Sequence, residues 1–551
     1  MRKASFFLIA IISYIYRIDA QNITEVVIAK DELFTQNQDH FSTAEDNARL
    51  MNESFRRVQD YLEGWLLLAD KKSLLIPRKY GQHFWNIKDA AADNYPFMVL
   101  TSYFVNQEKF NGIMKQMLQK EIALTSRIGN LPDDFDFKTQ EFRKSKAELD
   151  HILFGCSEYI KDGLLPLTEW LGQSPWYDRM VDILDDMWKY APIETPYGKI
   201  VSKNVEVNGE MLQVLSRLYW TTGKKEYLEY AIRIGDYYLL GKQHPTRDFM
   251  YLQLRDHGCE IISGLTELYA TVSVALPDKK EIYQAPMHEM LDCILKTGRN
   301  KHGLFYDAIS PKLGIILIPH LADTWGYTLN GFYTVYLIDK KESYREAAIK
   351  AMSNLYEHYR NHRWEFNKAD GYADAIESAL NLLNREFIPS TKEWIDSEIK
   401  VMWGKQDNDR AKHKGRIESW YGDGNFARTS IMYALWKTKG LRIDNWREDL
   451  QIGAEMKENR LFIVIKAKKD WKGNIYFDHQ RSKEIMKLPF DWPRINQFPE
   501  WYTVKKGSQY NVMLQTEAKK EKWSAEKLME GLTINIQGGK IFKIIVEPET
   551  N

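Results

Sequence analysis

The sequence has little cysteine and no net charge. Its three cysteines among 551 residues, Cys156, Cys259 and Cys293, are too few and too scattered for a disulfide framework, and their odd number indicates at least one buried thiol. The 76 basic and 76 acidic side chains cancel formally. This balance excludes the basic surface that nucleic-acid-binding proteins use, and it gives no attraction to an anionic membrane.

Long hydrophobic runs are also scarce, and the one at the N-terminus is short. It covers residues 6–16, which are too few to span a bilayer comfortably. The basic pair at residues 2–3 precedes it and Ile-Asp-Ala at residues 18–20 supplies a cleavage site, so we predict a secretory signal peptide over residues 1–20 and export to a periplasm. We expect no other membrane association, and an irregular leader over residues 21–43.

Motifs of several common enzyme classes are missing. The chain contains no Gly-rich phosphate loop and no Gly-x-Ser-x-Gly nucleophile elbow. His358 and His362 have helical i,i+4 spacing, but no Glu-x-x-His framework surrounds them. We therefore predict neither a metal site nor a cofactor.

A helical hairpin, in contrast, is present and repeated. A Lys-Lys-Glu motif opens the second helix of three hairpins, at Glu226, Glu281 and Glu342, with spacings of 55 and then 61 residues (281−226 and 342−281). One helix pair cannot bury its apolar stripe alone, so the repeats should stack. About a dozen helices are expected in the whole pattern. The sequence thus predicts a mainly α domain, an (α/α)6 toroid of six hairpins, over residues 44–445.

After Trp446 the period changes to that of strands. Residues 461–465 form a short apolar run, and residues 532–536 alternate between apolar and polar side chains. Gly538-Gly539 then predicts a hairpin turn into the strand at residues 541–546. We expect a C-terminal antiparallel β domain over residues 446–551, with a structural role or, alternatively, a carbohydrate-binding one.

Polar clusters precede the first helix of each hairpin. Equivalent helix starts in a closed ring of hairpins lie on the same rim, so the clusters are expected to converge on one polar pit. They are Asn208-Gly209-Glu210, Arg255-Asp256-His257-Gly258 and Asp323-Thr324-Trp325-Gly326-Tyr327.

These clusters offer acid–base and sugar-binding groups. His257 is the best candidate for acid–base chemistry because its ordinary pKa lies near neutrality. Arg255 is suited to holding a carboxylate through a bidentate fork. Trp325 offers a stacking platform, and Tyr327 a proton carrier. Two structural interpretations stay open: Asn208 as a helix cap, and His257 as a histidine paired to the aspartate beside it.

A last dense cluster lies before the final inner helix. Its candidate residues are Arg416, Trp420, Tyr421, Asp423 and Arg428. Two glycines within it allow the backbone to approach a ligand closely, and they also suit a turn into the helix. We expect both roles.

Three segments carry a resemblance to a known group of enzymes. They are residues 256–260 (Asp-His-Gly-Cys-Glu), 322–327 (Ala-Asp-Thr-Trp-Gly-Tyr) and 420–428 (Trp-Tyr-Gly-Asp-Gly-Asn-Phe-Ala-Arg). With the hairpins and the β domain, they resemble the six-hairpin carbohydrate-active enzymes, which include unsaturated glucuronyl hydrolases and toroidal polysaccharide lyases. The chain looks most like the oligosaccharide dehydratases of ulvan-degrading marine bacteria, over about residues 44–551.

The resemblance implies an elimination reaction. A dehydratase of this kind removes water from the non-reducing-end glucuronic or iduronic acid of an acidic oligosaccharide and leaves a 4,5-unsaturated uronic acid. The resemblance also implies that His257, Tyr327, Tyr421 and Asn208 are catalytic. The implied substrate-binding residues are Arg255, Glu210, Asp323, Trp325, Arg416, Trp420, Asp423 and Arg428.

Three alternatives remain at this point. A polysaccharide lyase would act on the same acidic substrates. A glycoside hydrolase would take its acid and base from Glu210, Asp256, Asp323 and Asp423. A non-catalytic glycan-binding protein is supported by the 13% aromatic content alone.

Overall fold

The chain forms two compact units in the computed structural model, which describes residues 32–414, 422–444, 446–516 and 520–549. The helical unit comprises residues 57–432 and 480–499, and the β unit comprises residues 1–56, 433–479 and 500–551. The mainly α class with a C-terminal antiparallel region is confirmed. The predicted signal peptide lies outside the described residues. No helix in the described part is long and apolar enough to cross a membrane.

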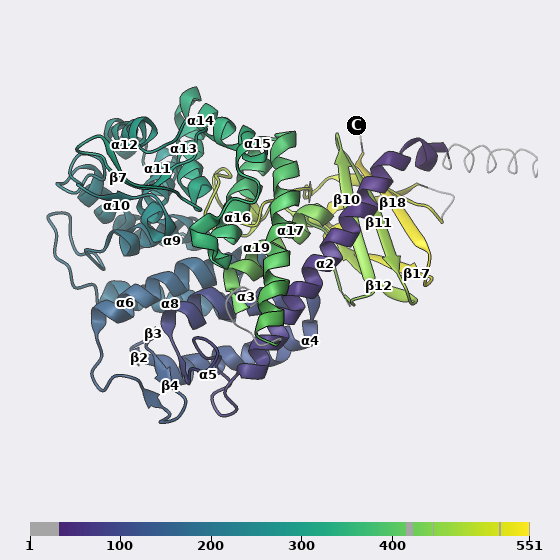
Figure 1. The fold of residues 1–551 in the computed structure, drawn as a ribbon, viewed down its shortest axis with the longest axis horizontal. Helices are drawn as coiled ribbons and strands as arrows, with labels where there is room; N and C mark the ends of the chain where they lie inside the picture. Colours follow the sequence, from purple (N-terminus) through teal and green to yellow (C-terminus); the bar gives the residue numbers. More distant parts are fainter. Residues whose placement is uncertain (1–31, 415–421, 445, 517–519, 550–551) are drawn as a thin grey trace, which may run out of the picture. The chain divides into compact units, whose positions relative to one another are not determined.

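Seven helical segments of the described chain are buried on nearly all sides, and we call them the inner helices. They are η1–α3 (Ile87–Asn94, Tyr95–Val105), α6–η3–α7 (Leu149–Glu158, Tyr159–Leu164, Leu165–Leu171), α9 (Val205–Thr222), α11 (Glu260–Ala275), α13 (Trp325–Asp339), α16 (Ala369–Arg385) and α19 (Gly424–Thr438). Outer helices precede or follow them along the chain (Figure 1). They are α2 (Gln38–Leu68), α5 (Lys115–Thr125), α8 (Pro175–Lys189), α10 (Lys225–Leu239), α12 (Pro277–Thr297), α14 (Glu342–Ser353) and α17 (Pro389–Lys412).

The inner helices contact one another in chain order and close a ring. Contacts run from η1 to η3, then to α9, α11, α13 and α16. The Thr429 hydroxyl on α19 donates to the Ala373 carbonyl on α16 at 3.0 Å. Gly424 at the start of α19 lies so close to η1 that a Cβ there would be 1.7 Å from the Asp93 carbonyl oxygen.

The described residues therefore contain one hairpin more than the six that the sequence predicted. The first two inner segments contain π-helical turns, η1 and η3. Such turns insert a residue and shift the 3.6-residue period. Both segments are also buried all round, so they carry no amphipathic stripe by which a hairpin could be counted.

The repeated motif at the start of the outer helices links each to the preceding outer helix. In every copy a lysine ammonium and a tyrosine hydroxyl bind one aspartate. The sets are Lys224 and Tyr227 with Asp185, Lys279 and Tyr283 with Asp236, and Lys341 and Tyr344 with Asp292. The stacking that the repeat predicted is thus made by side chains of the repeat itself.

The β unit contains a five-stranded antiparallel sheet in the order β10-β11-β18-β15-β16 and a three-stranded sheet in the order β17-β12-β9. The strands of the first are β10 (Leu450–Lys457), β11 (Arg460–Ala467), β15 (Gln509–Leu514), β16 (Glu521–Ser524) and β18 (Ile541–Pro548). Those of the second are β9 (Arg442–Ile443), β12 (Trp471–Tyr476) and β17 (Leu532–Ile536). Figure 1 labels several of these strands.

Two local predictions for this unit are wrong. The glycines at 538–539 do not join a hairpin, because β17 pairs with β12 whereas β18 pairs with β11 and β15. Helix α2 begins at Gln38, inside the segment expected to be irregular. Phe41 packs there in a cluster with Phe462 and Ile545 of the sheet, and that burial stabilises a helix start that lacks a clear capping signal.

Residues 480–499 were predicted as part of the β domain but pack within the helical unit. The Trp492 indole N–H donates to Glu267 Oε2 at 3.1 Å, and Arg494 Nε donates to Glu169 Oε1 at 3.1 Å. All of these side chains are buried. The segment is thereby fixed against the inner helices.

The cysteine prediction is confirmed. Cys156 and Cys259 are buried thiols, and Cys293 is partly buried and also free.

Candidate active site

The starts of the inner helices surround two adjoining cavities. The smaller, which we call the pit, has a volume of about 70 Å³. The larger, which we call the cleft, has a volume of about 370 Å³. Asp93, Asp370 and Asn425 line both cavities and so mark their junction. Residues of the clusters at 255–258 and 323–327 thus converge on the pit as the hairpin pattern predicted, whereas those of the cluster at 208–210 do not line it.

Four of the predicted site residues line these cavities. His257, Tyr327 and Arg428 line the pit, and Asp423 lines the cleft. His257 comes from η4 (Asp256–Cys259) and Tyr327 from the first turn of α13. Asp423 and Arg428 come from the start of α19. Each stands at or near a helix start, as the ring geometry requires.

Five other predicted residues line neither cavity. Trp325 is fully buried, so it offers no stacking surface. The Asn208 amide is also buried and donates to the Ser202 carbonyl at 2.9 Å and the Tyr238 hydroxyl at 3.0 Å. Arg255 lies 3.6 Å from both Asp307 and Glu365. Asp323 and Glu210 are buried behind the cavity walls.

Three further predicted residues, Arg416, Trp420 and Tyr421, lie outside the described residues.

A buried network holds Tyr327 in place. Its hydroxyl lies 2.9 Å from Asp374 Oδ1 and 2.8 Å from Glu377 Oε2. The Arg428 guanidinium pairs with the same two carboxylates at 2.6 and 2.8 Å. Burial raises the pKa of Glu377 to about 7, although the charge of Arg428 opposes the shift. The positive charge of Arg428 is thus already matched by protein carboxylates.

His257 is partly exposed, at 42% of its side chain, and is surrounded by acids. Its Nδ1 lies 3.2 Å from Glu206 Oε1, and its Nε2 lies 3.3 Å from Asp256 Oδ1 and 4.0 Å from Glu158 Oε1. Burial disfavours the imidazolium, but these carboxylates together raise the pKa of His257 well above its usual range. The cationic form therefore prevails at neutral pH.

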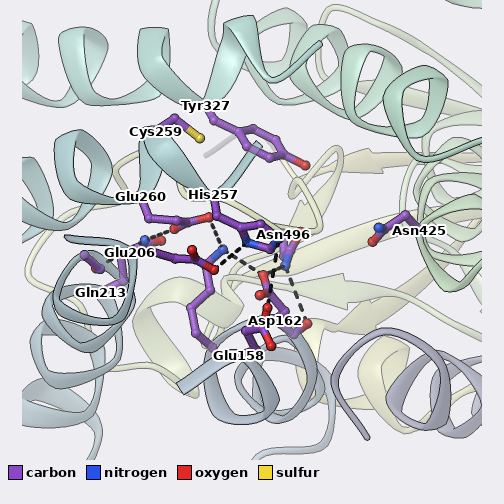
Figure 2. Close-up of polar contacts among 12 residues, drawn as sticks. Glu158, Asp162, Glu206, Gln213, His257, Cys259, Glu260, Tyr327, Asn425 and Asn496 are labelled. Carbon is purple, nitrogen blue, oxygen red and sulfur yellow. Dashed lines mark hydrogen bonds and ion pairs between the residues drawn. The ribbon is translucent and has the colours of Figure 1, made fainter. Parts of the chain in front are cut away.

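The remaining cation of the pit wall is also paired. Lys161 Nζ donates to Asp162 Oδ1 at 2.7 Å and also to Glu260 (Figure 2). The Asn496 amide donates to the same Asp162 oxygen at 3.0 Å. Asn496 comes from residues 480–499, so this segment supplies part of the pit wall.

Acidic side chains outnumber basic ones around the pit. The acids are Asp93, Asp162, Asp256, Glu260, Asp370 and Asp374, whereas the bases are Lys161, Arg428 and His257. Burial raises the pKa of Asp93 and of Asp370, so part of this acid excess is uncharged. Neutral hydroxyl groups of a sugar would find many acceptors there.

Two carboxyl groups of the cleft have different proton affinities. Burial, and then the charges of Asp374 and Asp423, raise the pKa of Asp370 well above its usual range. Burial raises the pKa of Asp423 only to about 6, because the backbone N–H of Phe426, 3.1 Å from its Oδ1, favours the ionised form. The surroundings therefore favour the protonated form of Asp370 more strongly than that of Asp423.

Several wall residues were not among the predicted site residues. They are Asp93, Lys161, Asp162 and Asp370. Lys161 and Asp162 lie in a π-helical segment without amphipathic period. The signal available was the four-residue spacing of Glu158 with Asp162 and of Glu206 with Glu210, which places acids on one helix face.

Comparisons with known proteins found no matching family model and no matching curated protein. Among solved structures, the chain is similar to the GH76A α-1,6-mannanase of Salegentibacter sp. HEL1_6, at 9% identity and a TM-score of 0.38, over 69% of this chain and 98% of that one. It is similar to a GH127 β-arabinofuranosidase, at 11% identity and a TM-score of 0.36, over 92% of this chain and 77% of that one. It is also similar to the cellobiose 2-epimerase from Spirochaeta thermophila DSM 6192, at 13% identity and a TM-score of 0.30, over 46% and 69%. These similarities do not assign an activity.

Proposed function

We propose that the chain is a carbohydrate-active hydrolase that cleaves a glycosidic bond held at the junction of the pit and the cleft. The observation that carries this proposal is the pair Asp370 and Asp423. Both line the cleft, and their surroundings favour the protonated form of Asp370 more strongly than that of Asp423. Such a division between two carboxyl groups is what glycoside hydrolysis needs.

In this proposal Asp370 is the general acid. Its carboxyl receives a hydrogen bond from the Asn425 amide, which fixes its orientation at the junction of the cavities. It donates its proton to the glycosidic oxygen as the bond breaks. Asp423 is the ionised partner, which stabilises the developing positive charge on the sugar or activates water.

The walls favour a neutral sugar. Arg428 and Lys161 of the pit are already engaged by protein carboxylates, so they are not available to hold a uronate carboxylate. In the cleft, Arg78 pairs with Asp89 and Lys368 with Glu365. Tyr80, which is 39% exposed, lines the cleft and offers a ring face on which a sugar could pack. We therefore favour a neutral oligosaccharide, bound in the cleft with its scissile bond at the junction with the pit, as the substrate.

Elimination of water from a terminal uronic acid is the second candidate. The observation in its favour is that His257 and Tyr327 line one pit, as the resemblance to the dehydratases implies. Both ring nitrogens of His257, however, face protein carboxylates: Nδ1 lies 3.2 Å from Glu206, and Nε2 lies 3.3 Å from Asp256 and 4.0 Å from Glu158. The ring is thus engaged by the protein and not by a substrate. Export to a periplasm fits either reaction and stays a prediction.

The test is product analysis on a panel of neutral oligosaccharides and ulvan-derived acidic oligosaccharides. Hydrolysis adds one water and shortens the chain, which mass spectrometry detects. Dehydration removes one water, keeps the chain length and produces the ultraviolet absorbance of an unsaturated uronic acid. Loss of water from acidic oligosaccharides without shortening would overturn the hydrolase proposal.

Substitution of the two carboxyls tests the assignment on any hydrolysed substrate. We expect Asp370→Asn and Asp423→Asn each to lower kcat by about 10²–10⁴-fold, the usual contribution of a positioned acid or base. Asp292→Asn, on the exposed outer helix α12, is the matched control and should keep wild-type activity.

Activity of the wild type should fall as the pH drops through about 6, where Asp423 becomes protonated. Asp423→Asn with wild-type kcat and the same acidic limb would contradict this role.

A further inference from the structure

Two pairs of carboxylates face His257 from neighbouring inner helices. Glu158 and Asp162 lie one helical turn apart on α6–η3, and Glu206 and Glu210 lie one turn apart at the start of α9. Four-residue spacing places each pair on one helix face. Both α6 and η3 contact α9. Figure 2 shows the imidazole among Glu158, Asp162 and Glu206.

Two groups of three side chains in this cluster, which have His257 in common, each place their ligand atoms close enough to share an ion. Atoms of Glu158, Glu206 and His257 lie within 4.8 Å of one another, and so do atoms of Asp162, Glu210 and His257. The shortest of these contacts from the ring is 3.2 Å, between His257 Nδ1 and Glu206 Oε1. A cation with ligand distances of about 2.0–2.2 Å fits between such atoms after small side-chain movements.

Buried oxygens of the cluster lack hydrogen-bond donors. Glu210 is fully buried, and within the described chain neither of its carboxylate oxygens accepts a hydrogen bond. Glu206 Oε1 and Glu158 Oε2 are also buried without a hydrogen bond from any described residue. Buried carboxylates without donors are costly and are generally compensated by an ion or a proton.

Nearby protein cations do not compensate the cluster. Lys161 is shared between Asp162 and Glu260, and Lys88 Nζ lies 3.6 Å from Glu158 Oε2. The carboxylates of Glu206 and Glu210 have no ammonium or guanidinium paired with them among the described residues. Without a metal ion, the His257 imidazolium and protons on the carboxyl groups must therefore compensate the cluster.

We propose that the chain binds one divalent transition-metal cation, of the Mn²⁺ or Zn²⁺ class, between His257 and the carboxylates that face it, Glu158, Asp162, Glu206 and Glu210. The imidazole nitrogen selects this class over Mg²⁺ and Ca²⁺, which prefer oxygen ligands throughout. His257 and Asp162 line the pit, so the cation lies in its wall. This site is independent of the hydrolysis assigned to Asp370 and Asp423.

The test measures metal binding directly, without substrate. The full-length protein is treated with a chelator and titrated with Mn²⁺, followed by electron paramagnetic resonance, and with Zn²⁺, followed by calorimetry. We expect one ion per chain at micromolar or lower free metal, and an increase in Tm on binding. Mg²⁺ and Ca²⁺ at the same concentrations should bind at least tenfold more weakly.

Variants locate the site. Glu210→Gln keeps the size of the buried side chain and should weaken binding by at least tenfold, with loss of the metal-dependent rise in Tm. Glu206→Gln, closer to the pit, should do the same if Glu210→Gln fails to fold. His151→Gln is the matched control, because His151 forms a separate cluster with Asp133 and Asp134 in which Asp133 is paired to Arg127 at 2.7 Å.

Three results would overturn the proposal. One is a folded, chelator-treated protein that binds neither Mn²⁺ nor Zn²⁺ at millimolar concentration, because protons would then compensate the carboxylates. Another is binding that is unchanged in both Glu206→Gln and Glu210→Gln. The third is binding that is lost in His151→Gln, which would place the ion in the other cluster.

Discussion

Individual residues of the helical unit are held by buried ion pairs as well as by apolar packing. The Arg217 guanidinium donates to Glu267 at 2.8 and 2.6 Å, and Trp492 donates to the same carboxylate. Both charged side chains are at most 2% exposed. A buried pair of this kind contributes mainly because breaking it leaves one charge without a partner.

Arg217→Met is therefore expected to lower the free energy of unfolding by about 3–5 kcal/mol, since Glu267 would remain buried and unpaired. The double variant Arg217→Met/Glu267→Met should recover most of that loss. Denaturant unfolding of the single and double variants measures the difference. Arg247→Met, in an exposed pair with Glu289, is the control and should change stability by less than about 1 kcal/mol. Equal losses in the single and double variants would contradict this account.

Neighbouring helices of the inner ring approach each other most closely at glycine residues. Gly209 on α9 faces the backbone of α11, where an added Cβ would lie 2.4 Å from the carbonyl carbon of Glu260. Gly264 on α11 faces α9 in return, with a Cβ position 2.3 Å from the Gly209 carbonyl oxygen. The two helices make close backbone contact there, and the Gln213 amide of α9 donates to Glu260 of α11.

Gly209→Ala should force α9 and α11 apart and lower the free energy of unfolding by about 1–3 kcal/mol, as overpacking does. Gly404→Ala is the matched control, because Gly404 lies in helix α17 with no atom within 4 Å of its Cβ position. That variant should be neutral or more stable by about 0.4–1 kcal/mol. Thermal unfolding of both proteins is the measurement. A Gly209→Ala protein as stable as the Gly404→Ala protein would show that the helices can separate freely.

The protein contains buried carboxyl groups, and folding favours the protonated form of these groups. Burial raises the pKa of Glu377 to about 7 and that of Glu398 to about 6, from an ordinary value of 4.5. The folded state then binds more protons than the unfolded chain between about pH 4.5 and 7. The stability that these groups contribute is complete below this window and is lost as the pH rises through it.

Tm should consequently be higher at pH 5 than at pH 7.5, by several degrees, when both are measured with a chelator present. Asp491 does not reverse this trend, because its pKa of about 2 lies below the window. Glu398→Gln should flatten the dependence, since Gln cannot ionise at the position where the Asn361 backbone N–H donates at 3.0 Å. A Tm that rises from pH 5 to 7.5 would contradict the expected sign.

The sequence by itself determined those features that depend on local periodicity, namely the helical region and the starts of several helices. Apolar spacing identified the helical region, and the repeated motif at Glu226, Glu281 and Glu342 marked the starts of three outer helices. Because equivalent helix starts were expected on one rim, His257 and Tyr327 were predicted to lie at one pit. These inferences hold because residues close together in the sequence determine where a helix starts. Successive hairpins are also neighbours in the ring.

Tertiary structure decided what depends on partners far along the chain. It set the number of inner helices, because fully buried segments with π-helical turns show no amphipathic stripe. It placed Asn496 in the pit wall, beside Asp162, which lies 334 residues earlier in the chain. It also buried Trp325 and turned Asn208 toward Tyr238. Which face of an entirely buried helix meets a cavity is settled by packing against distant segments, and no local pattern encodes that choice.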